Sequence, residues 1–159
     1  KLRRVGKNGK KIHVYKLRTM HPFSEYIQEY VYENNQLQNG GKFQDDFRVT
    51  TLGKVFRKFW IDELPMLVNL FKGEMKIIGV RPLSNHYFNL YSKELQEKRT
   101  QTKPGLIPPF YADMPETLEE IQESELKYLE AYKQNPVKTD WLYLRRALTN
   151  IVLKKERSN

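Results

Sequence analysis

The pattern of apolar and polar residues predicts two short strands and several helices. Apolar and polar residues alternate over Lys11–Leu17, after an Asn8-Gly9 turn signal, which predicts a strand. Met75–Gly79 is a short apolar run and predicts a buried strand. Lys103–Pro109 holds three prolines and one glycine, which predict a rigid loop.

The helices are predicted from apolar residues that recur every three or four positions. In the clearest of them, positions i, i+3, i+4, i+7 and i+8 are Leu52, Val55, Phe56, Phe59 and Trp60. Further helices are predicted over residues 24–33, 62–72, 87–100 and 116–133, and from Thr139 or Asp140 to Lys155, with a loop over 34–42. We therefore expect one mainly helical α+β domain over residues 1–159, with short strands.

Two of these helices combine an apolar face with flanking cations. In the last helix the shared face consists of Trp141, Leu144, Leu148, Ile151 and Val152, with Arg145, Arg146, Lys154 and Lys155 beside it. The helix over 52–60 has the same design, with Lys54, Arg57 and Lys58. Such a helix either packs on a core or lies in a membrane interface, where its cations meet lipid phosphates. Both interpretations stay open from the pattern alone.

The charge narrows the choice of partners. The chain has 28 Lys and Arg against 19 Asp and Glu, and a formal net charge of +9. A basic surface attracts the phosphates of nucleic acids, nucleotides or membranes, although a solvated face that only aids solubility also explains it. The absence of cysteine excludes a disulfide scaffold, Cys-ligated zinc, iron–sulfur clusters and thiol catalysis. The sequence contains no apolar run near the ~20 residues that a membrane span needs.

The segment Asp62-Glu63-Leu64-Pro65 places two adjacent carboxylates at a predicted helix start, and it has two interpretations. In the first, Asp62 is an N-cap, Glu63 favours the positive helix end and Pro65 fits the first turn, so the pair only stabilises the helix. In the second, one carboxylate attacks phosphorus as a nucleophile while its neighbour holds a divalent metal. Arg57 and Lys58, just before the pair, would then neutralise a phosphate.

A set of motifs in a fixed order carries a family resemblance over nearly the whole chain. The motifs are Arg4-Val5-Gly6 with Gly9, Tyr15-Lys16-Leu17-Arg18-Thr19-Met20, Arg48-Val49-Thr50 with Leu52-Gly53, Arg57-Lys58, Asp62-Glu63-Leu64-Pro65, Asn69 to Met75, Ile78-Gly79-Val80-Arg81-Pro82, Lys103-Pro104-Gly105-Leu106, and Tyr132 with Asn135-Pro136 and Asp140. This ordered set resembles the bacterial sugar transferases, the monotopic polyprenyl-phosphate phosphoglycosyltransferases.

The resemblance implies a reaction and its main residues. The family transfers a sugar-1-phosphate from a UDP-sugar to a polyprenyl phosphate such as undecaprenyl phosphate, and releases UMP. It starts lipid-linked glycan synthesis, as for exopolysaccharide or capsule, on the cytoplasmic face of the bacterial inner membrane. By resemblance, Asp62 is the nucleophile that forms a covalent phosphosugar intermediate, and Glu63 binds Mg²⁺, which offsets charge on the departing UMP.

Four cationic residues match basic positions of the family. Arg57 matches the arginine before the carboxylate pair, and Arg81 matches that of a Pro-Arg-Pro motif, so both are expected to hold phosphates. Lys16 and Arg18 match a basic Lys-Phe-Arg motif and are expected to contact substrate phosphate. For Arg81 the alternative is a structural role, in which a backbone carbonyl or a carboxylate partner lets it brace a turn.

The sequence also departs from the family pattern. Family members have a hydrophobic re-entrant helix ahead of the Arg-Val-Gly segment, whereas this sequence begins just after that point. We therefore expect either a soluble domain or one anchored by its amphipathic helices. Val80 replaces the first proline of Pro-Arg-Pro, and Ile107–Ala112 replaces the usual Thr-Gly-Trp-Ala-Gln. Because residues 113–130 also match poorly, the sequence predicts neither the sugar nor the oligomeric state.

Two other functions are considered beside the phosphoglycosyltransferase. One is a catalytically silent domain of the same fold that binds a membrane surface or a partner. The other is a nucleic-acid-binding module, which the net charge permits. No zinc-finger or RNP signature is present, and the aromatic residues fall on amphipathic helix faces, so no nucleic-acid partner is expected.

Overall fold

Helices dominate the part of the chain that the structure describes. The computed structural model describes residues 1–24, 26–27, 30–31, 37–38, 42–43 and 46–153. The helices are η1 (Lys7–Gly9), α2 (Thr51–Lys58), η2 (Ile61–Met66), α3 (Leu67–Phe71), α4 (Asn85–Asn89), α5 (Lys93–Thr100), α6 (Phe110–Asp113), α7 (Leu118–Gln134) and α8 (Pro136–Leu153), where η marks a 3-10 helix. The strands are β1 (Leu2–Val5), β2 (Lys11–Val14), β3 (Leu37–Gln38), β4 (Lys42–Phe43), β5 (Lys76–Ile78) and β6 (Gly105–Ile107). The expected mainly helical α+β fold with short strands is confirmed.

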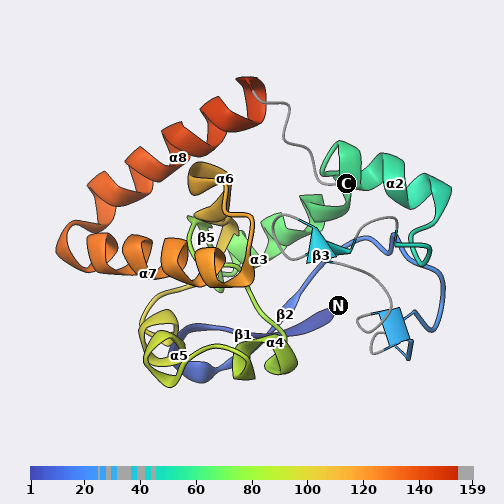
Figure 1. Cartoon of the computed structure of the whole chain (residues 1–159), viewed down its shortest axis with the longest axis horizontal. Coiled ribbons are helices and arrows are strands. Elements are labelled where there is room, and N and C mark those ends of the chain that lie inside the picture. Colours follow the sequence, from blue (N-terminus) through green and yellow to red (C-terminus); the bar gives the residue numbers. More distant parts are fainter. Residues whose placement is uncertain (25, 28–29, 32–36, 39–41, 44–45, 154–159) are drawn as a thin grey trace.

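The long helices α7 and α8 form a hairpin on one side of the molecule, and α2 lies on the other side (Figure 1). Between them lie α3, β5 and α6, with β1, β2, α4 and α5 below in this view (Figure 1). Helix α6 packs against both α7 and α8, and α5 packs against α7. The larger apolar core joins β5 to these helices through residues such as Ile78, Leu95, Tyr128 and Tyr143. A smaller core contains Ile12, Val14, Met66 and Met75, and lies beneath β2 and η2.

The strand predicted from Lys11 is confirmed, but it ends at Val14 rather than at Leu17. It pairs antiparallel with β1, a strand that the pattern did not predict. The turn between the two strands has left-handed φ angles at Asn8 and Gly9, of 57° and 70°. These two residues are the ones that tolerate this conformation most readily, so the turn signal was correct.

The predicted rigid loop over 103–109 is partly wrong, because Gly105–Ile107 forms β6. Strand β6 pairs parallel with β5, the strand predicted over Met75–Gly79, and Ile78 lies opposite Ile107. The backbones approach closely here, since a Cβ on Gly105 would lie 2.1 Å from the backbone nitrogen of Gly79. Only glycine fits such an approach. The pairing joins segments far apart in sequence and therefore leaves little local signal.

The helix predicted over 87–100 is in fact two helices, α4 and α5. Ser84 and Ser92 each cap one of them, accepting hydrogen bonds from the backbone nitrogens of Tyr87 and Leu95. A serine at an N-cap position favours a new helix start over continuation of the old one. The helices predicted over 52–60 and 116–133 are confirmed as α2 and α7.

The last helix begins earlier than predicted. Asn135 caps α8, because its side chain accepts a hydrogen bond from the backbone nitrogen of Lys138 at 3.1 Å, and Pro136 occupies the first helical position. The proposed caps at Thr139 and Asp140 are therefore wrong. Asp140 instead binds the ammonium group of Lys76 at 2.9 Å and the hydroxyl of Tyr128 at 2.6 Å, which ties α8 to β5 and α7.

Residues 25, 28–29, 32–36, 39–41 and 44–45 lie outside the described part of the chain. The helix predicted over 24–33 and the loop over 34–42 fall largely on them. Where this region is described, Leu37–Gln38 and Lys42–Phe43 pair as an antiparallel ladder, so the predicted loop contains part of a hairpin.

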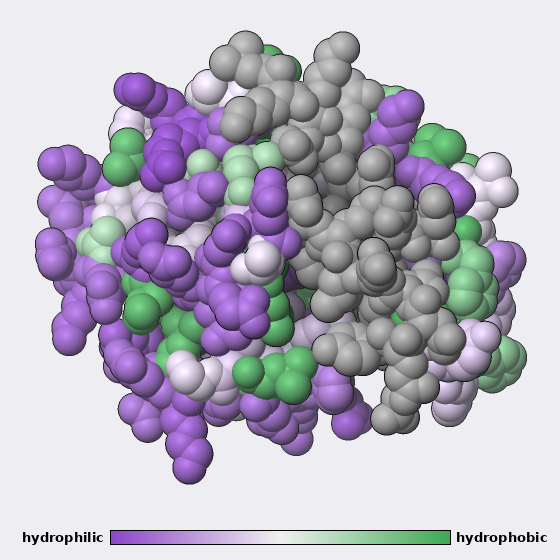
Figure 2. All heavy atoms as spheres, in the orientation of Figure 1, coloured by the Kyte–Doolittle hydropathy of each residue, from purple (hydrophilic) through white to green (hydrophobic). Residues whose placement is uncertain are grey.

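Helices α2 and α8 both expose apolar side chains. Leu52 and Val55 of α2, and Phe59 directly after it, are exposed, whereas Gly53 within the helix is buried. In α8, Trp141 and Val152 are 68% and 72% exposed, and the face predicted for this helix is only partly directed inward. Figure 2 shows hydrophobic side chains at the surface over α2, beside charged ones. Among the described residues, no helix has the length and apolar content that crossing a membrane requires.

Candidate functional site

The two adjacent carboxylates lie in η2, directly after a sharp turn of the backbone. Trp60 has a left-handed φ of 55°, which ends α2 and redirects the chain into η2. Asp62 is consequently buried, with 3% exposure, while Glu63 is half-buried. The interpretation of Asp62 as an N-cap is wrong, because Trp60 occupies the N-cap position of η2 and Asp62 lies inside this helix.

Lys16 joins the two carboxylates. Its ammonium nitrogen lies 3.2 Å from Oδ2 of Asp62 and 2.8 Å from Oε1 of Glu63. The backbone nitrogen of Leu17 donates to the carbonyl of Asp62 at 3.0 Å, which fixes the segment after β2 against η2. The structure therefore brings Lys16 to the pair from 46 positions away in sequence, and its predicted contact with substrate phosphate stays a prediction.

One oxygen of the Asp62 carboxylate stands apart from the contacts with Lys16. Oδ1 of Asp62 is buried and accepts no hydrogen bond within the described part of the chain. A buried carboxylate oxygen without a partner is costly, and native proteins rarely leave one unless a ligand or a reaction uses it. This oxygen is a candidate nucleophile, because it is the one that Lys16 does not occupy.

Asn69, which sequence analysis did not single out as a site residue, holds this arrangement together. Its side chain is fully buried and accepts from the backbone nitrogen of Tyr15 at 3.1 Å. Its amide nitrogen donates to the carbonyl of His13 at 2.8 Å and to Glu74 at 2.6 Å. The contacts fix the residue before Lys16. A polar residue on the inward face of a predicted helix was the available signal.

Arg57 lies on the last turn of α2, facing the carboxylate pair. Its Nε donates to the hydroxyl of Thr19 at 3.0 Å. Burial lowers the pKa of Arg57, and the nearby charge of Asp62 opposes that effect. Helix α2 can approach Thr19 because Gly53 has no side chain, since a Cβ there would lie 2.1 Å from the carbonyl oxygen of Thr19.

Arg81 follows β5 and presents an exposed side chain. Its guanidinium carbon lies 6.0 Å from the centre of the Phe110 ring, and it is within electrostatic range of Arg57. Among the described residues, its side chain makes no hydrogen bond or ion pair. The structural alternative, in which the Arg81 side chain braces a turn, is therefore not what is seen. The guanidinium is available to an anion.

Arg18 is placed differently from the other predicted cations. It lies between Leu17 and Thr19, which are both tied to the site, and its own side chain is exposed. Within the described ranges, no ion pair or hydrogen bond links Arg18 to the carboxylate pair. Its role in binding phosphate stays a prediction.

Helix α6 adds an aromatic wall that sequence analysis missed. The ring of Tyr111 packs edge-on against Trp60, with ring centres 5.6 Å apart. Burial raises the pKa of Tyr111 to about 12, and the charge of Glu63 adds to the rise. The phenol therefore keeps its proton at neutral pH and can donate a hydrogen bond. The segment departs from the family motif, so no sequence signal pointed to it.

A buried ion pair lies beside the site. Arg48 binds Asp46 with two parallel hydrogen bonds, of 2.7 Å from Nε and 2.6 Å from Nη2. The Asp46 carboxyl group is partly desolvated, which acts to raise its pKa. The hydrogen bonds from Arg48 outweigh this effect, and the pKa falls below its usual value. Both residues are also within electrostatic range of Arg57.

Replacing Asp46 by Asn should lower the free energy of unfolding by about 2 kcal/mol at pH 7, because the buried Arg48 guanidinium loses its ion pair with the Asp46 carboxylate. The stabilisation is fully present above the unfolded pKa of 3.8 and is lost as the pH falls through the lower folded value. Urea denaturation of both proteins from pH 7 to pH 3 measures this. A difference that stays constant down to pH 3 would contradict the assignment.

The arrangement can hold a diphosphate together with a divalent cation. Among the described residues, no group of three or more His, Cys, Asp or Glu side chains could form a metal site alone. Mg²⁺ is commonly bound through one or two carboxylates and the phosphates of a substrate, so the Asp62–Glu63 pair fits that mode. Lys16, Arg57 and Arg81 supply positive charge around the pair. The site thus has the composition of a phosphoryl-transfer centre.

Comparison with known proteins identifies the family. The sequence profile described as "Bacterial sugar transferase" matches residues 1–154. The chain therefore belongs to the bacterial sugar transferase family, and the resemblance seen in its motifs is confirmed.

Three relatives illustrate the family. The galactosyl transferase CpsE of Streptococcus agalactiae is 38% identical over 104 residues, which make up 65% of this chain and 23% of CpsE. A UDP-N-acetylgalactosamine-undecaprenyl-phosphate N-acetylgalactosaminephosphotransferase of Aeromonas hydrophila is 40% identical over 58% of this chain and 19% of its own length. A UDP-glucose:undecaprenyl-phosphate glucose-1-phosphate transferase of Caulobacter vibrioides is 37% identical over 65% of this chain and 36% of its own length. The chain thus matches well under half of each of these proteins.

Proposed function

We propose that this protein transfers a sugar-1-phosphate from a UDP-sugar to a polyprenyl phosphate and releases UMP. The observation that carries the proposal is the buried Asp62 carboxylate, whose Oδ1 accepts no hydrogen bond from the described residues and whose Oδ2 is held by Lys16. Family membership supports the reaction class, and the Caulobacter relative is named for a UDP-glucose donor and an undecaprenyl-phosphate acceptor. The product would begin a lipid-linked polysaccharide.

The reaction proceeds in two displacements. Oδ1 of Asp62 attacks the phosphorus that carries the sugar, and the bond from that phosphorus to the bridging oxygen breaks. UMP leaves with the electron pair, and the sugar phosphate remains on Asp62 as an acyl phosphate. A polyprenyl-phosphate oxygen then attacks the same phosphorus and releases the Asp62 carboxylate. Splitting the transfer in this way is ordinary nucleophilic catalysis.

The surrounding residues bind and orient the phosphates. Arg57 and Arg81 hold the diphosphate oxygens, since a guanidinium forms paired hydrogen bonds with phosphate. Lys16 aligns the carboxylates and neutralises charge as the diphosphate arrives. Glu63, with the substrate phosphates, would hold Mg²⁺, which when bound offsets the negative charge that develops on departing UMP.

The proposed acceptor is a lipid, so the domain should meet a membrane surface. The exposed Leu52 and Val55 of α2, with Phe59 at its C-cap, lie beside Lys54 and Lys58, which is the composition of an interfacial helix. Helix α8 has the same composition, with the exposed Trp141 and Val152 and cationic neighbours. We place the protein on the cytoplasmic face of the bacterial inner membrane, where polyprenyl phosphate and UDP-sugars meet.

The test measures products. The purified protein, in detergent or lipid nanodiscs, is incubated with Mg²⁺ and each of UDP-glucose, UDP-galactose, UDP-N-acetylglucosamine and UDP-N-acetylgalactosamine. UMP release on addition of undecaprenyl phosphate is the expected result, together with an intact-mass gain of one phosphosugar before the lipid is added. The productive donor identifies the sugar.

The alternative functions give different results. A catalytically silent membrane-binding domain would bind anionic vesicles and release no UMP with any donor. A nucleic-acid module would bind DNA or RNA with a steep salt dependence. Absence of UMP release with every donor, in protein that still binds vesicles, would overturn the proposed activity.

A further inference from the structure

A buried ion pair lies directly behind the turn that carries Arg81. Arg99 of α5 pairs with Glu125 of α7, and their side chains are only 4% and 1% exposed. Burial lowers the pKa of Arg99 to about 10, so the guanidinium remains protonated at neutral pH. Neither residue belongs to the phosphate site described above.

Stability alone does not explain such a pair. Removing two charges from water is costly, and replacing a buried pair by apolar side chains of similar volume is often neutral or stabilising. The surroundings would accept apolar groups, since Arg99 lies over the ring of Tyr91, 4.9 Å from its centre, next to the main core. The alternative to a stabilising role is that the ion pair positions a neighbouring part of the chain.

Arg99 uses its second terminal nitrogen on the turn itself. Its Nη2 donates to the backbone carbonyl of Arg81 at 2.5 Å. The flanking carbonyls of Val80 and Leu83 are held by the backbone nitrogens of Gly105 and Val5. At Arg81 the hydrogen bond comes from a side chain whose other terminal nitrogen, Nη1, forms the ion pair with Glu125.

We infer that Arg99, locked in place by Glu125, is a positioning residue that holds the backbone of Arg81 so that its exposed guanidinium faces the substrate phosphate. Pro82 restricts Arg81 to extended backbone conformations, and the bond from Arg99 fixes the peptide that follows. The inference rests on the proposed function, because it assigns Arg81 to phosphate binding. A displacement of about 1 Å at a binding group can cost about 100-fold in rate.

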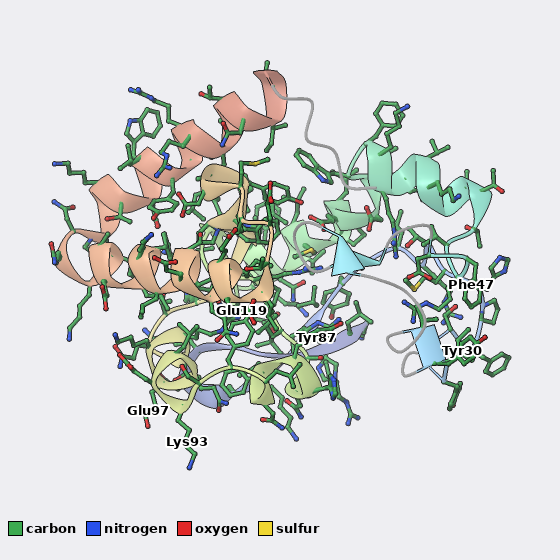
Figure 3. The ribbon with its side chains drawn as sticks, viewed as in Figure 1. Tyr30, Phe47, Tyr87, Lys93, Glu97 and Glu119 are labelled. Carbon is green, nitrogen blue, oxygen red and sulfur yellow. The ribbon has the colours of Figure 1, made fainter. Side chains whose placement is uncertain are left out.

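The main variant removes both charges together. Arg99→Met/Glu125→Leu leaves no buried charge unpaired, and methionine retains a favourable contact with the Tyr91 ring. The matched control, Lys93→Met/Glu97→Leu, likewise replaces one cation by methionine and one glutamate by leucine, but on the outer side of α5, where both side chains point into solvent (Figure 3). Arg99→Lys is a second variant, since a single ammonium keeps the charge but cannot reproduce the guanidinium's two fixed directions.

Steady-state kinetics with the productive UDP-sugar, with thermal unfolding in parallel, tests the inference. The apolar pair should raise KM and lower kcat/KM by about 10- to 100-fold, while the unfolding midpoint stays near that of the parent and the control variant keeps parental kinetics. In an Arg81→Ala background the same pair should cause no further loss, because the residue it positions is gone. Arg99→Lys should show a similar rise in KM.

Other results would overturn the positioning role of Arg99 or the phosphate-binding role of Arg81. If Arg81→Ala lowers kcat/KM but the apolar pair stays within twofold of the parent, the positioning role is wrong. If the two losses multiply fully in the triple variant, Arg99 does not act through Arg81, and the inference fails. If Arg81→Ala leaves kcat/KM unchanged, the phosphate-binding role of Arg81 fails, and the inference fails with it.

Discussion

Replacing Asp62 by Asn should reduce UMP release by about 10⁴-fold or more and abolish the intact-mass gain. The amide that replaces the carboxylate is a poor nucleophile, and no other carboxylate oxygen is in its place. The fold should survive, because Lys16 keeps its 2.8 Å ion pair with Glu63 and the backbone bond from Leu17 to Asp62 is unaffected. The measurement is UMP release and intact mass with the productive UDP-sugar.

Glu119→Gln is a suitable control for this change. It also turns one carboxylate into an amide, but on the exposed first turn of α7 (Figure 3). It should leave both readouts at the parental level. A phosphosugar adduct that persists in Asp62→Asn would contradict the assignment of Asp62 and direct attention to Glu63 as the attacking group.

The fold could be predicted where one helix carries its own signal. Helices α2 and α7 have regular apolar spacing, and a side-chain cap starts each, from Thr50 and Thr117. The local sequence did not predict the structure where pairing with a distant segment determines it. Strand β6 forms because Gly79 and Gly105 let β5 and β6 approach closely. Neither glycine, taken with its neighbours in sequence, indicates that pairing. Capping residues mark helix starts, but several positions compete for that role, as the choice of Asn135 over Thr139 shows.

The candidate site was also predictable only in part, because some of its geometry depends on tertiary packing. Asp62, Glu63 and Arg57 are close in sequence, and a simple helix start would have explained the carboxylates equally well. What distinguishes the two interpretations is the left-handed turn at Trp60, which buries Asp62 and directs it toward Lys16. Tertiary packing imposes that turn on a residue with no intrinsic preference for it. The family motifs grouped Lys16 and Arg81 with these residues, which the apolar periodicity of the sequence could not do.

Arg57→Met should lower kcat/KM for the UDP-sugar by about 10²- to 10³-fold, the usual cost of removing a donor that faces developing charge. The charge of Arg57 lies within electrostatic range of the Asp62 carboxylate. Without it, the carboxylate pair repels the incoming diphosphate more strongly. Methionine is also unbranched and has a similar helix propensity, so α2 should remain folded. Initial rates over a range of UDP-sugar concentrations, with circular dichroism as the folding check, measure the effect.

Two further variants define what Arg57 contributes. Lys54→Met removes an exposed cation from the same helix. Measured in detergent, where no anionic membrane surface is present for Lys54 to contact, it should stay within about twofold of the parent, because a solvated charge is screened. Arg57→Lys keeps the charge but loses the bond from Nε to Thr19 and the paired geometry, so its kcat/KM should fall between those of the parent and Arg57→Met. Equal losses in Lys54→Met and Arg57→Met would mean that α2 acts through its net charge alone. A parental rate in Arg57→Lys would show that the charge matters and that the fixed guanidinium orientation does not.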